Sequence, residues 1–386
     1  MRLCRKCILP ETFPGIRFSN EGVCNLCLEF KGVEHLGRKK KEYEQRFERL
    51  VKEYKGKNSY DALMCYSGGK DSTYTLTILK EEYGLNVLAL TLDNGFIPEQ
   101  TFKNIRNVVE NLGIDHIFFK PRFDILKKIF SKCAKDNIYP PKTLERSSSI
   151  CTSCMGIVKF SAFRLALEKN IPFITFGWSP GQAPITSSIM KNNPQMLKMM
   201  QNVIFEPLYK LAGNEIKSYF LEDIHFGDSN RFPYNINPLA FLEYNEEKIY
   251  QKIFQLGWKT PQDTDANSTN CLLNAFANKV HIKRYGFHPY AWEIANMVRE
   301  GVMTREEGYK KIYAEQPANL GEIAKKLDMI LCKGLENWLE CLECPHLCTK
   351  ICPIESENVV EEMNRQIRLL SISDKQSQKG SRQFKK

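Results

Sequence analysis

A glycine-rich segment, Ser-Gly-Gly-Lys-Asp-Ser at positions 67–72, has residue types that can bind an anion. It follows a short apolar run (62–66) and precedes a stretch with helical periodicity (72–80). Glycines let the backbone turn tightly and approach a ligand, and the first N–H groups of a helix face the same point. The segment therefore predicts a phosphate-binding loop between a buried strand and a helix.

The spacing of this loop differs from G-x-x-x-x-G-K-[ST], the pattern of loops that pass a γ-phosphate to water or a hydroxyl. It resembles the PP-loop, SGGxDS, of the ATP pyrophosphatases. That resemblance implies that ATP, bound with Mg²⁺, transfers AMP to a substrate oxygen and releases pyrophosphate. It also implies a pyrophosphate site, in which Lys70 assists electrostatically, made of Ser67, Gly68, Gly69, Asp71 and Ser72.

Three further apolar runs, at 86–92, 116–119 and 172–177, each follow a stretch with helical periodicity. Such alternation predicts an α/β fold with a doubly wound parallel sheet, and the resemblance makes it a PP-loop or HUP-like one. Asp93 directly follows the second run, where a carboxylate can reach the nucleoside of ATP. Gly177 ends the fourth run and is assigned to the same nucleotide site.

Four cysteines in two C-x2-C pairs near the start of the chain have the spacing of a zinc ribbon. They predict a domain over 1–30 whose zinc is structural, because four thiolates leave no open coordination position. The alternative is that they are small buried apolar residues. Residues 31–58 are charged, and Tyr43, Phe47, Leu50 and Tyr54 recur at three and four residues, which predicts a connecting helix. The four predicted ligands are Cys4, Cys7, Cys24 and Cys27.

A second group combines Cys151 and Cys154, a C-x2-C pair, with the distant Cys271. Three thiolates could hold a [4Fe–4S] cluster with one iron free, or they could hold a zinc ion. Two of them could instead form a redox pair while the third takes no part, or all three could be buried thiols without a function. With the loop and the terminal knuckle, this set resembles the cluster-dependent tRNA thiolation enzymes. That resemblance implies that the three cysteines hold a cluster and that sulfur from a donor replaces a carbonyl oxygen.

A competing resemblance begins at Cys4 and runs through Cys27: this opening is similar to that of bacterial surface-sugar N-acetyl amidotransferases. That family adenylates an acetamido group and uses ammonia, here from a partner glutaminase, to form an acetamidino group. We favour thiolation because ammonia transfer needs no thiolates, whereas sulfur transfer needs a place for a reactive sulfur. A nucleotide- or RNA-binding module without catalysis is the third interpretation.

The polar segment 263–271 matches neither family, and it could form a substrate pocket or a cap of hydrogen-bonded turns. His281 and His288 could move protons near neutral pH. A lone histidine among aromatic residues is, however, more often a packed residue.

The domain from 59 to 330 is predicted to be catalytic, with a helical substrate extension from about 240. A metal knuckle is predicted at 331–355, followed by a helix and a basic disordered tail at 356–386. The knuckle resembles a ferredoxin pattern with one extra residue, so zinc and a cluster are both consistent, and His346 adds a further ligand candidate. Its predicted ligands are Cys341, Cys344, Cys348 and Cys352.

The whole chain of 386 residues is 42% hydrophobic, enough for a buried core, and we expect no stretch of ~20 apolar residues that spans a membrane. No apolar signal segment follows Met1, so a cytoplasmic protein is expected. Fourteen cysteines in a reducing compartment then favour metal ligands over disulfides. The net charge of +10 suits tRNA, but it suits a small-molecule or peptide-like amide substrate equally well. The sequence leaves the oligomeric state open, a homodimer included.

Overall fold

The computed structural model describes residues 1–329 except 263, 266 and 315–319. In this part of the chain six strands form one sheet in the order β3-β2-β1-β4-β6-β5. All neighbours are parallel except β5 and β6. The predicted parallel α/β fold is confirmed, and the antiparallel edge strand is an addition. The strands are β1 (Ala62–Cys65), β2 (Val87–Leu92), β3 (Asp115–Phe119), β4 (Phe173–Phe176), β5 (Ile189–Lys191) and β6 (Tyr234–Ile236).

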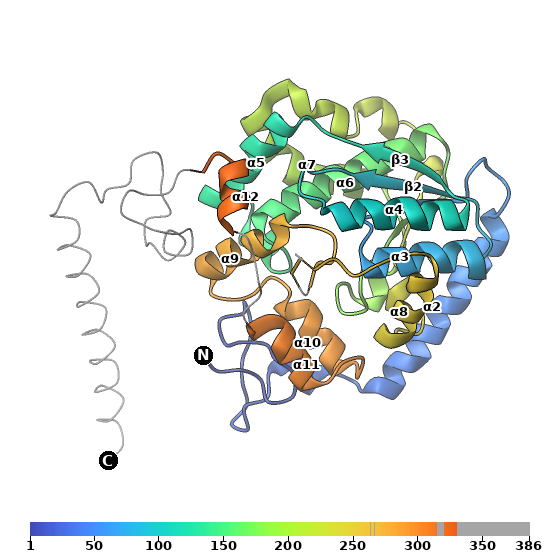
Figure 1. The fold of residues 1–386 in the computed structure, drawn as a ribbon. Helices are drawn as coiled ribbons and strands as arrows, with labels where there is room; N and C mark the ends of the chain where they lie inside the picture. Colours follow the sequence, from blue (N-terminus) through green and yellow to red (C-terminus); the bar gives the residue numbers. More distant parts are fainter. Residues whose placement is uncertain (263, 266, 315–319, 330–386) are drawn as a thin grey trace, which may run out of the picture.

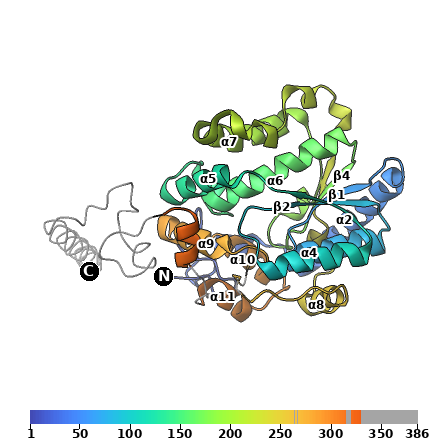
Figure 2. The same ribbon diagram turned by 45° about the horizontal axis from the view of Figure 1, so that its top comes forward.

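Helices cover both faces of the sheet, as a doubly wound fold requires (Figure 1, Figure 2). One face carries α2 (Val33–Tyr54), α3 (Lys70–Thr77) and α4 (Glu99–Leu112). The other face carries α5 (Phe123–Lys135), α6 (Ser149–Glu168) and α7 (Pro194–Ala212).

The remaining helices lie around the N-terminal cysteine ribbon (1–30) and beyond the ends of the strands, or they connect the main elements. The α-helices among them are α1 (Asn25–Glu29), α8 (Glu246–Gln255), α9 (Leu273–Tyr285), α10 (Ala291–Arg299), α11 (Arg305–Tyr313) and α12 (Leu320–Lys326). A π-helical turn, η1 (Ile78–Glu82), extends α3. The short 3₁₀ helices are η2 (Pro141–Leu144), η3 (Ile185–Ser187), η4 (Gly213–Tyr219), η5 (Asp223–Phe226), η6 (Ser229–Arg231) and η7 (Pro238–Ala240).

The two faces of the sheet have separate apolar cores because successive strand residues point to opposite sides. In β1, Leu63 packs into the core under α5 and α6, while Ala62 and Met64 pack under α2, α3 and α4. Phe47 of α2 is fully buried on this second side and packs edge-on against Phe173 of β4. The helix expected between the ribbon and the sheet thus buries one face against the sheet. The predicted domain boundaries at 30, 58 and 330 stay predictions.

Helix α6 is the most apolar of the described helices and, by length and mean hydropathy (1.4) alone, could cross a membrane. This corrects the expectation that no stretch is apolar enough. Just over half of its apolar window (56%) is buried, and α6 packs between α5 and α7 and against β1 and β4. Its composition is accounted for by this central position.

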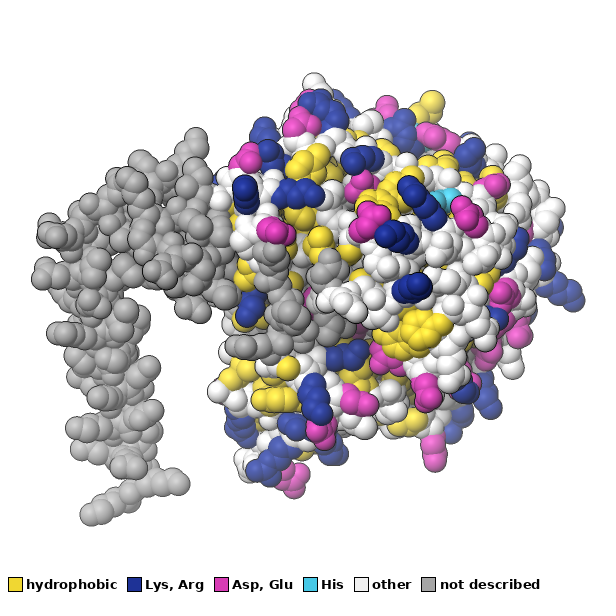
Figure 3. Space-filling model, viewed as in Figure 1, with side chains coloured by type: hydrophobic (Ala, Val, Ile, Leu, Met, Phe, Trp, Pro, Cys, Tyr) yellow, Lys and Arg dark blue, Asp and Glu magenta, His cyan; other side chains and the backbone are white. Residues whose placement is uncertain are grey.

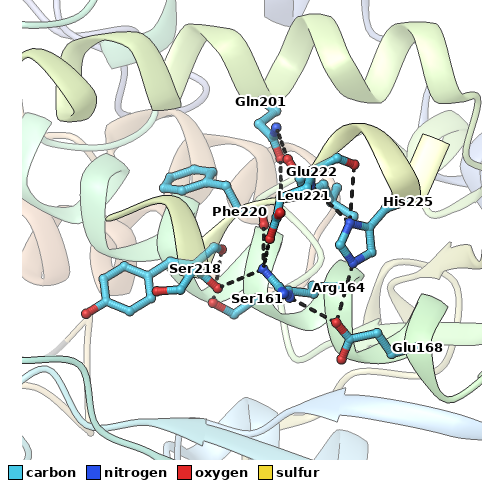
Figure 4. A network of polar contacts seen from close by, with 10 residues as sticks. Ser161, Arg164, Glu168, Gln201, Ser218, Phe220, Leu221, Glu222 and His225 are labelled. Carbon is cyan, nitrogen blue, oxygen red and sulfur yellow. Dashed lines mark hydrogen bonds and ion pairs between the residues drawn. The ribbon is translucent and has the colours of Figure 1, made fainter. Parts of the chain in front are cut away.

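A polar network holds the irregular segment 218–225 against α6 (Figure 4). The Arg164 guanidinium donates to the backbone carbonyls of Ser218 and Phe220, and to the Glu222 carboxylate at 2.8 Å. Gln201 of α7 exchanges two hydrogen bonds with the backbone of Leu221. These bonds pair backbone groups that no strand or helix would satisfy, so α6 and α7 are fixed to each other.

A substitution of Gly177, directly after β4, tests how closely the sheet packs on α3. A Cβ at this position would lie 2.3 Å from Ser72 Cα, which is backbone and cannot move aside. Gly177→Ala is therefore expected to lower the free energy of unfolding by about 1–3 kcal/mol. The measurement is a urea titration followed by circular dichroism.

The matched control is Gly37→Ala on α2, where a Cβ would meet no atom within 4 Å. This substitution should be neutral or stabilise the chain by up to about 1 kcal/mol, because alanine favours a helix. Equal unfolding midpoints for the two variants would contradict the packing described.

Candidate functional site

The predicted phosphate loop connects β1 to α3 and has a backbone that only glycine permits at one position. Gly68 has a left-handed φ of +76°, and a Cβ there would lie 2.6 Å from Ile105 of α4. The Trp258 indole donates a 2.9 Å hydrogen bond to the Gly68 carbonyl. Both contacts hold the loop backbone directly before the first amides of α3.

A segment far along the sequence covers this loop. Residues 267–272, here called the strap, run from Asn267, which donates to the Lys311 carbonyl, to Leu272, which donates to the Phe96 carbonyl. Between these ends, Thr269 Oγ1 accepts the Lys70 backbone N–H at 3.1 Å. The hydroxyl therefore takes the place that a phosphate oxygen takes at a helix N-terminus. The strap is the part of 263–271 whose role the sequence left open.

Lys70 lies in a buried cluster with partners from α3 and α8. Its Nζ donates to Asp71 Oδ1 at 2.8 Å and to the Tyr244 hydroxyl at 2.6 Å, and it lies 3.2 Å from Glu246 Oε1. Burial alone would lower the pKa of Lys70, but Asp71, Tyr244 and Glu246 raise it well above its usual value. The lysine therefore stays charged, as binding of a polyphosphate requires.

The remaining loop residues contact one another. Ser72 Oγ lies 3.0 Å from Ser67 Oγ and donates to the Gly69 carbonyl. Asp93, at the end of β2, is buried and accepts the Gly95 N–H at 2.8 Å, with Lys120 Nζ at 3.0 Å. The structure thus places every predicted loop residue, and Asp93, near the same edge of the sheet. Their roles toward a nucleotide stay predictions.

The three distant cysteines also gather at this edge. Asn94, next to Asp93, points its amide Nδ2 at Cys154 Sγ (3.6 Å) and at Cys271 Sγ (3.5 Å). The amide of Asn274 reaches Cys151 Sγ at 3.7 Å. The strap thus contacts the phosphate loop through Thr269 and lies among the thiols through Cys271, so both groups belong to one site.

The environment of these thiols decides what they can bind. Burial raises the pKa of Cys151 and Cys154 to about 12, and it also raises the pKa of Cys271. Yet all three side chains keep some exposed surface, as expected of groups that line a recess. Cations bind thiolates, so a bound cation would have to displace three protons here.

Their spacing bears on which cation fits. Among the described residues, only the ribbon cysteines bring their ligand atoms within 4.8 Å of one another. The trio of Cys151, Cys154 and Cys271 does not form so close a group, and a [4Fe–4S] cluster does not require one, because each of its cysteines binds a different iron. Its donor set of three thiols, with amide donors beside them, is chemically suited to such a cluster.

The ribbon fits a single tetrahedral ion. Its sulfurs lie 3.8 Å apart for Cys4 and Cys27, and 3.7 Å for Cys7 and Cys24. A tetrahedral Zn²⁺ with bonds of about 2.3 Å separates its sulfurs by roughly 3.8 Å. The Arg299 guanidinium of α10 donates to Cys7 Sγ at 3.3 Å, which suits the negative charge of four thiolates. The predicted metal-binding ribbon is therefore present; which ion it holds stays a prediction.

The histidines are packed rather than poised for proton transfer. Burial lowers the pKa of His281 to about 3 and that of His288 to about 4, so both are neutral near pH 7. His288 accepts the Tyr290 backbone N–H.

The predicted knuckle at 331–355, with Cys341, Cys344, Cys348 and Cys352, and the tail at 356–386 lie outside the described residues.

Several site residues escaped the sequence reasoning. Asn94 adjoins Asp93, and Asn-Gly after a strand could have flagged it. Thr269 lay in a segment noted for its polarity, but its partner was not predictable. Tyr244 and Glu246 reach Lys70 from more than 170 residues away and carry no local signal.

The fold and site define a class: α/β proteins with a mainly parallel sheet and a glycine-rich loop between a strand and a helix at its carboxyl edge. No protein-family model matches the chain. By sequence, the chain is 26% identical over 326 residues to the uncharacterized protein MJ1599 of Methanocaldococcus jannaschii, covering 84% of this chain and 97% of that one. A second uncharacterized protein of the same organism, MJ0066, is 26% identical over 137 residues, 30% of this chain and 27% of that one.

Solved structures that are similar to this chain include the following three. The U34-tRNA thiolase NcsA from Methanococcus maripaludis, with its [4Fe–4S] cluster, is 18% identical (86% of this chain, 99% of that one; TM-score 0.33). A predicted subunit of tRNA methyltransferase from Methanocaldococcus jannaschii is 18% identical (60% and 91%; 0.30). The NMN synthetase from Francisella tularensis is 12% identical (72% and 98%; 0.33). These scores carry no conclusion about activity, which has to rest on the residues of this chain.

The strap generates a prediction about nucleotide affinity. Because the Thr269 hydroxyl occupies the Lys70 N–H, Thr269→Ala removes a competitor and should tighten MgATP binding by about fivefold, the equivalent of one net hydrogen bond of ~1 kcal/mol. Isothermal titration calorimetry measures the affinity.

Ser187→Ala serves as the control, because Ser187 is exposed and bonds only its local turn at Pro184. Its affinity for MgATP should equal that of the unaltered chain. Weaker binding by Thr269→Ala would mean that the hydroxyl contacts the nucleotide instead of competing with it.

The ribbon generates a second prediction. Cys24→Ser removes one of four converging thiols and should lower the zinc content by about one ion per chain, measured by atomic emission. Unchanged zinc would exclude the ribbon as a zinc site. Cys133→Ser, which alters a thiol paired with Ser153 in the core, should leave the zinc content unchanged.

Proposed function

We propose that this chain is a PP-loop ATP pyrophosphatase that adenylates the carbonyl oxygen of an amide-like substrate and then replaces that oxygen with sulfur. The observation that carries the proposal is the joining of two chemistries in one site. The strap touches the phosphate loop through Thr269 and reaches the thiol trio through Cys271, two residues later.

The phosphate loop suits the first half of the reaction. Backbone amides at the start of α3 and the charged Lys70 face the position of the β- and γ-phosphates, and Asp71 offers an oxygen to Mg²⁺. Phosphate oxygens would replace Thr269 on the Lys70 N–H and compete with Glu246 for the ammonium. Pyrophosphate leaves from this end, and AMP remains on the substrate oxygen.

The thiol trio suits the second half. When bound at Cys151, Cys154 and Cys271, a [4Fe–4S] cluster supplies one iron with an open position for sulfide. Asn94 and Asn274 orient the three sulfurs by donating to them. We further propose a cytoplasmic location, because reactive thiols call for a reducing compartment and the reaction needs ATP.

The substrate is either an RNA base or a small amide. On the face in Figure 3, basic side chains are interspersed with acidic ones and form no continuous stripe among the described residues. A small-molecule or peptide-like amide therefore fits at least as well as tRNA. The alternative nucleophile is ammonia from a partner glutaminase. The resemblance of the first residues to the sugar amidotransferases supports this alternative, whereas the thiol trio does not.

The proposal is tested by incubating the anaerobically purified chain with MgATP and sulfide, or with ammonia, and a panel of unfractionated tRNA, N-acetyl sugars and small amides. Equal amounts of AMP and pyrophosphate, with an oxygen-to-sulfur mass change in one substrate, are expected. A mass change for nitrogen instead would establish amidation. Lack of AMP with every substrate would leave only nucleotide or RNA binding.

Two variants separate the half-reactions. Asp71→Ala should lower AMP formation by at least about 10²-fold without loss of iron or zinc, because only the phosphate end is altered. Cys271→Ala should lose iron and sulfur transfer but keep its zinc. Cys133→Ser is the control, with full iron content and activity. Full sulfur transfer by Cys271→Ala would refute the role of the trio.

A further inference from the structure

Glu293, in the first turn of α10, is a carboxylic acid at the carboxyl edge of the sheet that the proposed reaction has not yet used. Its Oε1 accepts a 2.5 Å hydrogen bond from Ser179 Oγ. Ser179 follows β4 two residues after Gly177, which packs directly on Ser72 at the start of α3. The acid is thus fixed beside the strand end that contacts the phosphate-loop helix.

The backbone around Glu293 is held tightly. A Cβ at Gly181 would lie 2.1 Å from the Glu293 carbonyl oxygen, and Asn296 donates to the Gly181 carbonyl at 2.9 Å. On the other side, Tyr290 accepts a 3.0 Å hydrogen bond from Asn274, the residue whose amide also reaches Cys151. The start of α10 therefore lies between the phosphate loop and the thiols.

The surroundings of the Glu293 carboxyl group allow it to take up and release a proton near neutral pH. Burial raises the pKa of Glu293 to about 7, and the negative charge of Asp71 on α3 adds to the rise. The Ser179 hydrogen bond, Lys311 of α11 and Lys70 of α3 act in the opposite direction. Glu293 nevertheless keeps accessible surface, as the three thiols do.

We propose that Glu293 accepts the proton that the substrate amide loses on adenylation and returns it when sulfur replaces AMP. This inference rests on the proposed function, because it assigns a role within that reaction. It would hold equally if ammonia were the nucleophile, since both routes begin with the same adenylation.

The substrate is an amide of the general form R–CO–NH–R′. Its oxygen attacks the α-phosphorus of ATP, the bond to the bridging oxygen breaks, and pyrophosphate leaves with the electron pair. The N–H proton passes to the Glu293 carboxylate, and a C=N bond forms. Hydrosulfide then adds to the carbon, and the C–O bond breaks so that AMP leaves with the electron pair. The proton returns from Glu293 to nitrogen and the S–H proton passes to water, which yields R–CS–NH–R′.

The first test needs no substrate. The infrared band of the protonated acid is measured from about pH 5 to about pH 9, as the difference between the unaltered chain and Glu293→Gln, with and without Mg²⁺ and α,β-methylene-ATP. A midpoint near 7 that moves upward by roughly half a unit or more on binding is expected, because nearby phosphates disfavour the carboxylate. Glu300→Gln, at the C-cap of the same helix and ion-paired with Lys40, supplies a control band that the nucleotide leaves unchanged.

Two failures are distinguishable in this experiment. If calorimetry detects no binding of the analogue, the proposed function itself fails, and this inference with it. If the analogue binds and the Glu293 midpoint stays in place, the nucleotide does not approach Glu293, and only the role of Glu293 is overturned.

The second test is the pH profile of AMP formation with the substrate that the panel identifies. In the unaltered chain the rate should rise through about pH 7, because the base acts as carboxylate. Glu293→Gln should lower the rate by about 10²–10⁴-fold and abolish that rise. Ser179→Ala should move the rise to higher pH, since it removes a hydrogen bond that lowers the pKa. An equal loss at every pH in the Ser179 variant, or full activity of Glu293→Gln, would refute the proposal.

Discussion

The rest of the site depends on how closely the backbone of the phosphate loop is packed. Gly68 lies against Ile105 of α4, and Gly177 at the end of β4 lies against Ser72 of α3, with no room for a methyl group at either contact. At Gly177 the end of β4 therefore meets the backbone of α3, while at Gly68 the loop meets the Ile105 side chain, so the start of α3 is held by the elements around it. Preorganisation of this kind lets a loop bind an anion without first ordering its own chain.

Much of this architecture could be predicted from the sequence because its signals are local. Short apolar runs bounded by helical stretches identified β1, β2, β3 and β4, and glycine spacing identified the loop between β1 and α3. The edge strands β5 and β6 have three residues each, too few for a periodic pattern. Cysteine spacing predicted the ribbon, since both members of each pair lie within one turn of chain.

What the sequence could not predict are contacts between distant polar residues. Three such contacts depend on where the tertiary fold places single side chains. They are those of Tyr244 and Glu246 with the Lys70 ammonium, of Thr269 with the Lys70 N–H, and of Ser179 with Glu293. Polar residues of these types occur throughout the chain, so nothing in their local pattern distinguishes them. The same holds for the pKa of Glu293, which burial by distant elements sets and which no neighbour in sequence reveals.

The docking of the ribbon on α10 and α11 has a consequence for how the chain is made. Cys7 and the Arg299 that contacts its sulfur are 292 residues apart, and Arg305 binds the Cys4 and Cys7 carbonyls across a similar separation. On the ribosome the ribbon emerges first, whereas its covering helices follow only after the whole sheet has been synthesised. About 30 residues cannot stay folded through that interval by apolar burial alone, so an early-bound metal would keep the ribbon folded until its partner helices appear.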